Sequence, residues 1–579
     1  MANPNRTPGR PIMSATLSNV IGLVKGPGVS PHTFEIVSAD QERKLKLGEF
    51  VTYLVNIDAQ EREVLARVNE RQPLRLYPNG FLADPDLSPD FLASSLGYNG
   101  ERSELFKITV EVLGYFDPEL RDFINPRVTP RIGSQVRLAS DEFLATVLNR
   151  RKVGSIGGAH IGSLLSRSKG RVPVVLDLEA ICSTHLAIIA STGAGKSYLA
   201  GVLIEEMLSS YNRAALLVID PHGEYDTLTE MHSLLKQADY SPEVSIYRPG
   251  EVKIRIGSLS MSDLRYLLPD MSERMEYVLR LAFQRVQRKS KQKHAGDSDR
   301  WRLDELIEEL KAIGQLEDPE SDDGEIAENG GKYKDTADAV IWRLNTALGQ
   351  NQVFDNLQQV NLQDLIRPGK CAVMQLNQVD SRQQQVIVAT LLRKLYQARV
   401  RTEKGEASQA ENKDFYLPYP VFILIEEAHH FTPANGDAIS TEILKQILAE
   451  GRKFGIGVGL ISQRPGKLDA DALSQCNTQF LLRIVNPVDQ SRVRESVESV
   501  GQDLINELPA LTKGQAIIAG AAVNAPLLCQ VRSRVTSHGA DDISAPKQWM
   551  TYFSKEETFR RERENSVIEV IPPRSRKTK

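Results

Sequence analysis

The segment from Ala190 to Ser197 constrains the fold of this chain more than any other part of the sequence. It reads Ala-Ser-Thr-Gly-Ala-Gly-Lys-Ser, follows an apolar run at 185–189, and precedes helical apolar spacing at 198–204. A strand, a glycine-bearing loop and a helix start in this order are typical of a phosphate-binding P-loop. The glycines let backbone N–H groups turn toward an anion, and the helix start adds partial positive charge. The sequence therefore predicts a site for nucleotide phosphates.

Within this loop the residue types suggest separate roles. Lys196 is expected to reach the β- and γ-phosphates, and the Ser197 hydroxyl to take a Mg²⁺ position, so the expected cofactors are ATP and Mg²⁺. Ala190 stands where the stricter pattern has glycine, which still permits the turn, and the alternative is an ordinary glycine-rich turn. The expected nucleotide contacts are Thr192, Gly193, Ala194, Gly195, Lys196, Ser197 and Tyr198.

Residues 151–535 alternate strand-like and helix-like segments, which indicates an α/β domain with a parallel sheet and crossover helices. Residues 262–348 form an expected helical insertion, in which Ser272 is the N-cap of a helix and 288–334 are a mobile or partly disordered loop. The expected buried strands are His185–Ala190, Ala215–Asp220, Cys371–Leu376, Val421–Ile425, Gly457–Ser462, Gln479–Ile484 and Gln515–Ala519.

The remaining chain has a different pattern on each side of this domain. Residues 1–12 are expected to be a disordered tail, and short alternating apolar runs within 13–150 predict a small β-barrel. Prolines at 78, 85 and 89 mark residues 75–102 as an excursion from the barrel or as a free linker. Residues 536–579 are a polar tail that either braces an adjacent subunit or is disordered.

Hydrolysis needs acidic groups beside the phosphates, and Val421–Glu427 supplies them after a five-residue apolar run. A strand buried on both faces delivers its last carboxylates to the edge of the sheet. Glu426 is the expected Mg²⁺ residue, and Glu427 is the expected base that orients the attacking water. Ordinary strand ends also carry acids, so the assignment depends on the P-loop upstream.

Two further strand ends carry polar groups. Gln463 follows the strand at 457–462 and is expected to sense the γ-phosphate or the water, unless it is a plain polar turn. Asp220 and Glu224 are expected as acids at the edge of the site, with a turn-stabilising role as the alternative for Glu224. A zinc site at His222 is not expected, because no Cys or His stands at ligand spacing from it.

Basic residues near these strands allow two interpretations each. Arg452, which follows a helix beginning near Thr441, is either a finger toward a neighbouring subunit's nucleotide or a solvated surface residue. Arg464 and Lys467, in the loop after the sensor strand, are possible contacts for nucleic-acid phosphates or are simply solvated. Pore residues are not otherwise assigned.

Composition excludes some classes of protein. Lys and Arg number 71 against 75 Asp and Glu, so the net charge of -4 does not by itself indicate nucleic-acid binding. The four cysteines lack metal-ligand spacing and are expected to be reduced core residues. The most apolar segment, 516–528, is too short for a membrane span. The sequence therefore predicts a cytoplasmic protein without a membrane anchor or signal peptide.

Several strings together resemble the HerA family of hexameric ATPases, in the HerA–FtsK branch of P-loop motors. They are Thr192–Ser197, Asp220–Tyr225, Glu426–His429 and Gly451–Gly455, with Gly162–Leu165 and Val172–Val174 after the barrel. The resemblance implies a RecA-like core, a homohexameric ring that threads double-stranded DNA, and a partner nuclease or effector in DNA-end resection or phage defence. It implies that Lys196, Glu427, Asp220 and Gln463 act in cis and Arg452 in trans. Thr184 departs from the family pattern, which often has arginine there.

Three functions remain open from the sequence. The first is an ATP-driven double-stranded DNA translocase or helicase. The second is a motor for protein or conjugative transfer, and the third is an ATP-dependent ring that scaffolds an effector. The barrel is expected to supply partner docking and ring contacts.

Overall fold

The computed structural model describes residues 20–28, 32–40, 44–57, 59–74, 105–117, 119–120, 122–294, 299–316, 332–349, 352–408, 415–497, 500–537 and 544–553. The tail at 1–12, the excursion at 75–102 and most of the C-terminal tail lie outside these residues. The chain divides into two compact units, 1–537 and 538–579. In the second unit residues 545–553 are helical.

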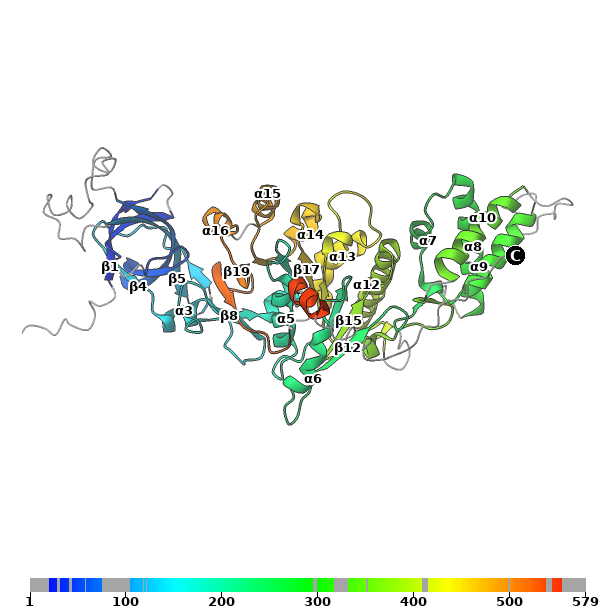
Figure 1. Ribbon diagram of the computed structural model, residues 1–579, viewed down its shortest axis with the longest axis horizontal. Coiled ribbons are helices and arrows are strands. Elements are labelled where there is room, and N and C mark those ends of the chain that lie inside the picture. Colours follow the sequence, from blue (N-terminus) through cyan, green and yellow to red (C-terminus); the bar gives the residue numbers. More distant parts are fainter. Residues whose placement is uncertain are drawn as a thin grey trace, which may run out of the picture. The chain divides into compact units, whose positions relative to one another are not determined.

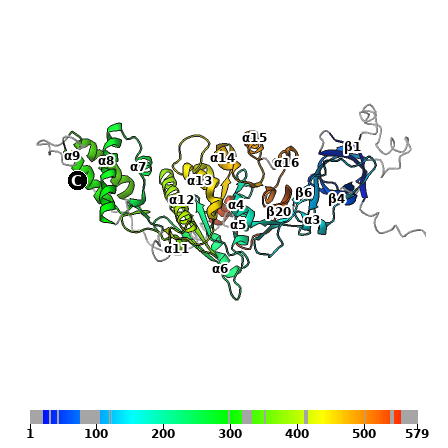
Figure 2. The ribbon, with the colours of Figure 1, turned by 180° about the vertical axis from the view of Figure 1, so that it is seen from behind.

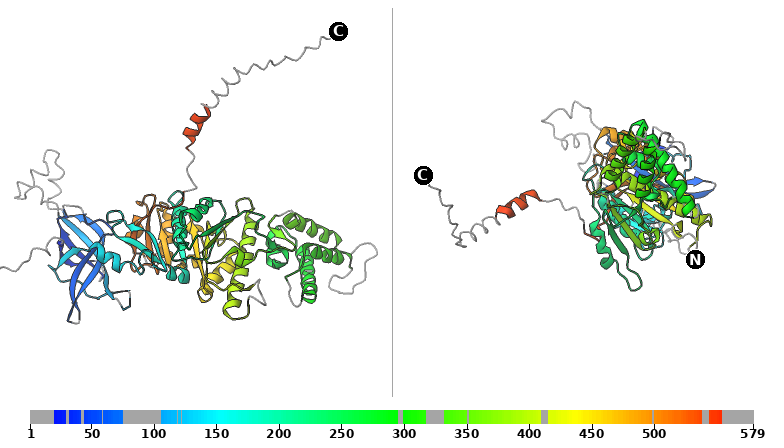
Figure 3. Two further views of the ribbon diagram at one scale, coloured as in Figure 1. Left: turned by 90° about the horizontal axis from the view of Figure 1, so that it is seen from below. Right: turned by 90° about the vertical axis from the view of Figure 1, so that its right-hand side faces the viewer.

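The N-terminal region contains an antiparallel β-barrel (Figures 1 and 3). Its strand order is β2-β1-β7-β3-β4-β5, and the pairing of β2 with β5 closes it. Buried and partly exposed side chains alternate along β2, as expected for a strand with one face on a core. The bounds are β1 (Val20–Pro27), β2 (Thr33–Ser38), β3 (Phe50–Ile57), β4 (Gln60–Pro73), β5 (Phe106–Asp117) and β7 (Gln135–Leu138), with β6 (Asp122–Ile124) paired to β5. The predicted barrel is confirmed.

The ATPase region is built on an eleven-stranded sheet of order β12-β15-β11-β16-β17-β10-β18-β19-β20-β8-β9. The strands from β12 to β18 run parallel, as predicted, but β18 pairs antiparallel with β19 and the sheet continues antiparallel to β9. The bounds are β8 (Gly158–Leu164), β9 (Pro173–Asp177), β10 (Leu186–Ile189), β11 (Leu216–Asp220), β12 (Glu243–Tyr247), β15 (Lys370–Gln375), β16 (Val421–Ile425), β17 (Ile456–Ser462), β18 (Thr478–Leu481), β19 (Gln515–Gly520) and β20 (Leu527–Val531).

Helices cover both faces of this sheet because alternate strand residues point to opposite sides. Leu186 and Ile188 of β10 join the core formed with α5 (Lys196–Met207), whereas Ala187 and Ile189 join the core formed with α12 (Ser381–Glu403). Helices α12, α13 (Thr441–Glu450) and α14 (Ala470–Ser474) pack in that order (Figure 2). The other helices here are α3 (Asp141–Val147), α4 (Leu178–Thr184), α6 (Met231–Leu234), α11 (Leu362–Leu365), α15 (Pro487–Ser496) and α16 (Gln502–Glu507).

The insertion is helical, as predicted, and packs around its own apolar residues. It contains α7 (Met261–Leu267), α8 (Glu273–Lys293), α9 (Leu303–Gln315) and α10 (Lys334–Leu344), and the short strands β13 (Ile254–Arg255) and β14 (Phe354–Asp355) pair beside it. Ser272 caps α8 by accepting from the Met275 N–H. The expectation of a mobile loop over 288–334 is wrong for residues 288–293, which continue α8, and for residues 299–316. There α9 presents an apolar stripe, and Trp301 is fully buried edge-on to Phe283 with ring centroids 5.7 Å apart.

Candidate functional site: a P-loop and a carboxylate pair

The predicted phosphate loop lies between β10 and α5. Gly193 has a φ of 77° and Gly195, the N-cap of α5, a φ of 100°, left-handed values that glycine adopts without strain. The exposed N–H groups at the start of α5 favour an anion. A cavity of about 240 Å³ adjoins the loop, lined by Ser191, Thr192, Gly193, Ala194, Arg483, Val485 and Lys513. The segment therefore has the geometry of a phosphate cradle.

Lys196 reaches across the sheet to the carboxylates that end β16. Its Nζ lies 2.5 Å from Glu426 Oε1 and 3.1 Å from Glu427 Oε1. Burial opposes the charge of this ammonium, but Glu426, Glu427 and Glu224 outweigh that effect and raise the pKa of Lys196. The structure thus brings together the P-loop lysine and both acids that the sequence singled out.

Glu426 is fully buried, and burial raises the pKa of its carboxyl to about 7. Lys196 and a hydrogen bond donated by Tyr225 Oη over 2.8 Å act in the opposite direction. A cation beside this buried carboxyl group stabilises its ionised form and lowers its pKa. The sequence analysis did not assign Tyr225 to this role.

Glu427 adopts a left-handed backbone conformation with a φ of 49°, uncommon for a residue with a side chain. Its Oε2 is buried and has no hydrogen-bond donor within the described part of the chain, although His429 Nδ1 lies 3.2 Å away. Burial, assisted by His430, lowers the pKa of His429 to about 4, so this ring is neutral near pH 7. The turn after β16 therefore places one oxygen of Glu427 beside Lys196 and leaves the other without a donor in the described part of the chain.

The loop after β11 supports the P-loop helix. The Ser197 hydroxyl donates to the Glu224 carboxylate. Asp220 lies behind this loop with no exposed surface, and it accepts backbone N–H groups from residues 222–225, at 2.8 Å for Gly223. Burial raises the pKa of Asp220, and these donors oppose the shift. In this geometry Asp220 shapes the loop that carries Glu224 and Tyr225.

Gln463 follows β17 and contacts the P-loop directly. Its Oε1 accepts a hydrogen bond from the Thr192 hydroxyl over 2.7 Å. Tyr198, one turn into α5, accepts instead from the backbone N–H of Arg534 over 2.9 Å. Gln463 is thus placed to link the phosphate loop to β17, and Tyr198 links α5 to the segment after β20.

Arg452 lies at the other edge of the sheet. It is exposed in the 3-10 turn Gly451–Phe454, just before β17 begins, whereas Gln463 follows the end of the same strand. At ~3.3 Å per residue, the seven residues of β17 separate these positions by about 20 Å. Arg452 therefore lies far from the P-loop of its own chain. Thr184 ends α4, which contacts the same turn.

The other basic residues fall into two groups. Arg464 and Lys467 are exposed around the 3-10 turn Pro465–Lys467, after the carboxyl end of β17. Arg483 and Lys513 line the P-loop cavity, and the sequence analysis missed both. Neither residue belongs to a sequence motif. They reach the cavity because β18 lies between β10 and β19 in the sheet.

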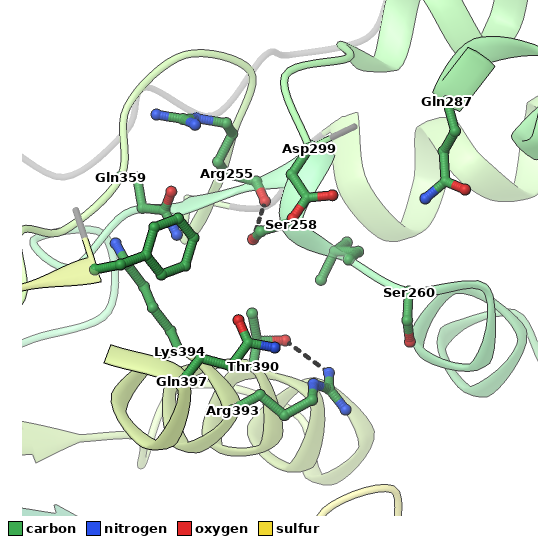
Figure 4. Close-up of a pocket in the computed structure, with 12 residues that line it drawn as sticks. Arg255, Ser258, Ser260, Gln287, Asp299, Gln359, Thr390, Arg393, Lys394 and Gln397 are labelled. Atoms are coloured by element: carbon green, nitrogen blue, oxygen red, sulfur yellow. Dashed lines mark hydrogen bonds between the residues drawn. The ribbon is translucent and has the colours of Figure 1, made fainter. Parts of the chain in front are cut away.

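A second cavity, of about 230 Å³, lies where the insertion meets α12 (Figure 4). Its lining is mostly polar and includes no P-loop residue, and Arg393 within it is already paired with Asp263. The full lining is Arg255, Ser258, Leu259, Ser260, Gln287, Asp299, Gln359, Thr390, Arg393, Lys394, Gln397 and Phe415.

The donor set at the P-loop fits magnesium, which prefers oxygen ligands and needs few from the protein when a nucleotide supplies others. The oxygens near Lys196 belong to the Glu426 and Glu427 carboxylates, and the Ser197 hydroxyl is bonded to Glu224. Across the described ranges, no group of three or more His, Cys, Asp or Glu side chains is arranged to hold a metal on its own.

A P-loop in the same parallel sheet as a strand that ends in two buried carboxylates defines a RecA-like P-loop ATPase. Comparisons with known proteins narrow this class. Residues 159–395 match the family model described as "Helicase HerA, central domain". The chain is 30% identical over 483 residues to the DNA double-strand break repair helicase HerA of Pyrococcus furiosus, covering 78% of this chain and 83% of that one. The chain belongs to the HerA helicase family, and it is an ATPase.

Another curated relative aligns with most of this chain. A probable helicase of Methanocaldococcus jannaschii, MJECL08, is 29% identical over 91% of this chain and 98% of its own length. Among solved structures, VirB4 of Thermoanaerobacter pseudethanolicus aligns with a TM-score of 0.45 and 13% identity, over 66% of this chain and 98% of that chain. None of the helices in the described ranges combines the length and apolar character needed to cross a membrane.

Proposed function

We propose that this protein is an ATP-driven double-stranded DNA translocase or helicase that acts in the cytoplasm as a homohexamer. Its work on DNA is proposed from the relatives, several of which are named DNA double-strand break repair helicases. The observation that carries the assembly is the separation of Arg452 from the P-loop of its own chain. A ring of head-to-tail subunits brings the Arg452 edge of one subunit to the P-loop edge of the next.

Arg452 is well supported for such a role. His185 is buried between α4 and β10, where its Nδ1 accepts the Val458 N–H over 3.1 Å and its Nε2 lies 2.9 Å from the Leu448 carbonyl. Arg399 donates to the Phe454 carbonyl over 2.7 Å. These contacts hold the end of the turn and the residues on either side of it, and Arg452 and Lys453 are exposed on the turn. A fixed cation stabilises the charge that develops on a transferred phosphoryl group.

In hydrolysis the Lys196 ammonium exchanges its carboxylate partners for the β- and γ-phosphates. Glu427 is then free to accept a hydrogen bond from the attacking water and to take its proton. Gln463 reports the presence of the γ-phosphate to β17 through its contact with Thr192. When bound, magnesium neutralises phosphate charge and orients the phosphate oxygens, and we assign Ser197 and Glu426 to hold it.

We propose contacts with DNA and with partners from the places of three segments in the chain. Arg464 and Lys467 lie on an exposed loop and are proposed contacts for duplex phosphates, which contribute sequence-independent and salt-sensitive affinity. The barrel is the proposed docking site for a partner nuclease or another effector in DNA-end processing or phage defence. The tail at 536–579 is proposed as an inter-subunit brace.

Mixed rings test the shared site. Lys196→Ala should remove ATP binding, and Arg452→Ala should bind ATP without hydrolysing it. If Arg452 acts in trans, a 1:1 mixture of these inactive variants recovers turnover, up to about a quarter of the wild-type rate for independent sites in random rings. A mixture in which co-assembly is verified and no turnover returns contradicts the assignment. Lys453→Ala, at the exposed neighbouring position, serves as the control and should keep its turnover.

Two further measurements separate the other functions. Stimulation of ATPase activity by duplex DNA is expected, with affinity that falls as salt rises. ATPase activity that ignores DNA, together with no duplex binding at low salt, points to a motor for protein transfer. Full biological activity of Glu427→Gln, which should hold ATP without turnover, points to a scaffold.

A further inference from the structure

The P-loop cavity extends beyond the residues that hydrolysis requires. One wall is the phosphate loop, and the other consists of Arg483, Val485 and Lys513. No motif in the sequence includes these three side chains. Their chemistry, two cations beside one apolar group, differs from that of the carboxylate side of the site.

Sheet order fixes which part of a nucleotide faces this wall. Glu427 follows β16, which is separated from β10 by β17, so the hydrolytic groups lie on the β17 side of the P-loop. β18 is the neighbour of β10 on the opposite side. The γ-phosphate must lie against Glu427, and therefore the α-phosphate and the nucleoside extend over the end of β18.

Register places the three residues at that end. Ile189 of β10 is level with Leu481 of β18, and the Ser191 N–H donates to the Arg483 carbonyl over 2.9 Å. Leu481 is opposite Ile517 of the antiparallel strand β19, and beyond this pair Val485 and Lys513 line the same cavity. The turn that carries Lys513 also packs on the P-loop, because a Cβ on Gly195 would lie 3.7 Å from the Gly514 nitrogen.

The three side chains are available to a ligand. Arg483 and Lys513 are exposed, and neither forms an ion pair or a side-chain hydrogen bond within the part of the chain that the structure describes. Val485 is 52% exposed beside them. Arg483 follows β18 and its carbonyl accepts the Ser191 N–H, and Lys513 lies in the turn before β19, so only the heads of the two cations must order on binding.

We infer that Arg483 and Lys513 bind the α-phosphate side of the nucleotide in cis, and that Val485 packs against the nucleoside. The inference rests on the proposed ATP site and extends it. Arginine and lysine form charge-assisted hydrogen bonds with phosphate, and a base or sugar face is favoured by an apolar neighbour. A cavity of about 240 Å³ is far larger than the ~10–15 Å³ that one water needs, which leaves room for such a group.

Nucleotide affinity in the full-length protein tests this inference. The double variant Arg483→Ala with Lys513→Ala should raise the Kd for ATP and for ADP by about 100-fold or more, because it removes two charged hydrogen bonds that contribute roughly 10- to 150-fold each. Its turnover should fall at ATP concentrations below the raised Kd and recover as ATP is increased, because both groups lie away from the γ-phosphate. The charge-preserving pair Arg483→Lys with Lys513→Arg should restore most of the affinity. Lys169→Ala, an exposed cation in the β8–β9 loop, should leave the Kd unchanged.

A second variant separates the nucleoside from the phosphates. Val485→Ser should weaken ATP several-fold and leave the binding of inorganic tripolyphosphate unchanged. The inference is overturned if the alanine pair keeps the wild-type Kd for ATP, whether or not turnover or DNA stimulation falls. A Val485→Ser variant that weakens tripolyphosphate as much as ATP refutes the nucleoside contact. Failure of the wild-type protein itself to bind ATP would count against the proposed function instead.

Discussion

Acid should lower the free energy of unfolding of this protein, because His185 is buried in its neutral form beside the turn that carries Arg452. The ring is 2% exposed, and burial lowers its pKa to about 4 from the reference value of 6.5. Nδ1 must be unprotonated to accept the Val458 N–H. Protonation therefore places an unpaired charge in the core and removes that hydrogen bond.

The sign and size of the effect follow from linkage. The unfolded chain binds a proton at His185 near pH 6.5 and the folded chain only near pH 4, so stability is complete above pH 6.5 and falls between these values. At ~1.36 kcal/mol per pH unit, this histidine lowers the free energy of unfolding by about 2 kcal/mol at pH 5 relative to pH 8. Below about pH 4 it costs nothing further.

Denaturation at pH 8 and at pH 5 measures this cost directly. In the variant His185→Asn, position 185 no longer titrates. Its free energy of unfolding should therefore fall by about 2 kcal/mol less than that of wild type between pH 8 and pH 5, although the variant is less stable at both pH values. His32→Asn, at an exposed histidine of the barrel, should keep the full wild-type loss. Equal pH dependence in wild type and His185→Asn would refute the buried-neutral assignment.

Two further predictions concern the site and the insertion. Tyr225→Phe removes the hydroxyl that stabilises the Glu426 carboxylate, so the pKa of Glu426 rises and the acid limb of the pH profile of ATPase activity moves to higher pH; an unmoved limb contradicts this. Trp301→Ala removes a fully buried ring and should cost about 3–5 kcal/mol. Limited proteolysis should then cut the insertion faster, whereas truncation of the exposed Trp342 should not accelerate it.

The parallel strands other than β12 were predictable from apolar runs bounded by polar turns, whereas the edge strand β12, Glu-Val-Ser-Ile-Tyr, has no such run and was missed. The antiparallel half was largely missed for a physical reason. β8 reads Gly-Ala-His-Ile-Gly-Ser-Leu and lacks an apolar run, since small residues suffice where another backbone packs closely. At Gly162 an added Cβ would lie 2.0 Å from the Gln530 carbonyl oxygen. Such a constraint comes from the neighbouring strand and leaves no periodic pattern.

Helix α9 was missed for a related reason. Its apolar positions, Leu303, Leu306, Leu310 and Ile313, recur at helical spacing, but charged residues between them lower the average hydrophobicity of the segment. Composition suggested a loop, whereas periodicity is the stronger indicator of a buried helix face. Trp301 just before this helix is the large apolar side chain that could have corrected the interpretation.

In the site, the contacts that follow from local motifs were predictable and those that follow from sheet order were not. Lys196 and the Glu426–Glu427 pair are recognisable from the segments that carry them. The contact between Tyr225 and Glu426 joins residues 201 positions apart, and it depends on β11 lying beside β16. Arg483 and Lys513 depend in the same way on the pairing of β18 with both β10 and β19.

The charge balance of the site explains why a nucleotide and a neighbouring subunit should depend on each other. Lys196 faces Glu426, Glu427 and Glu224, so the buried cluster carries more acid than base before any phosphate enters. A triphosphate adds several negative charges, which the start of α5, bound magnesium and, on our inference, Arg483 and Lys513 offset, while the acidic excess of the cluster remains. If Arg452 of the adjacent subunit supplies the remaining positive charge, the same contact stabilises both the bound nucleotide and the subunit interface. Linkage then requires ATP to tighten the ring by the same factor by which ring closure tightens ATP.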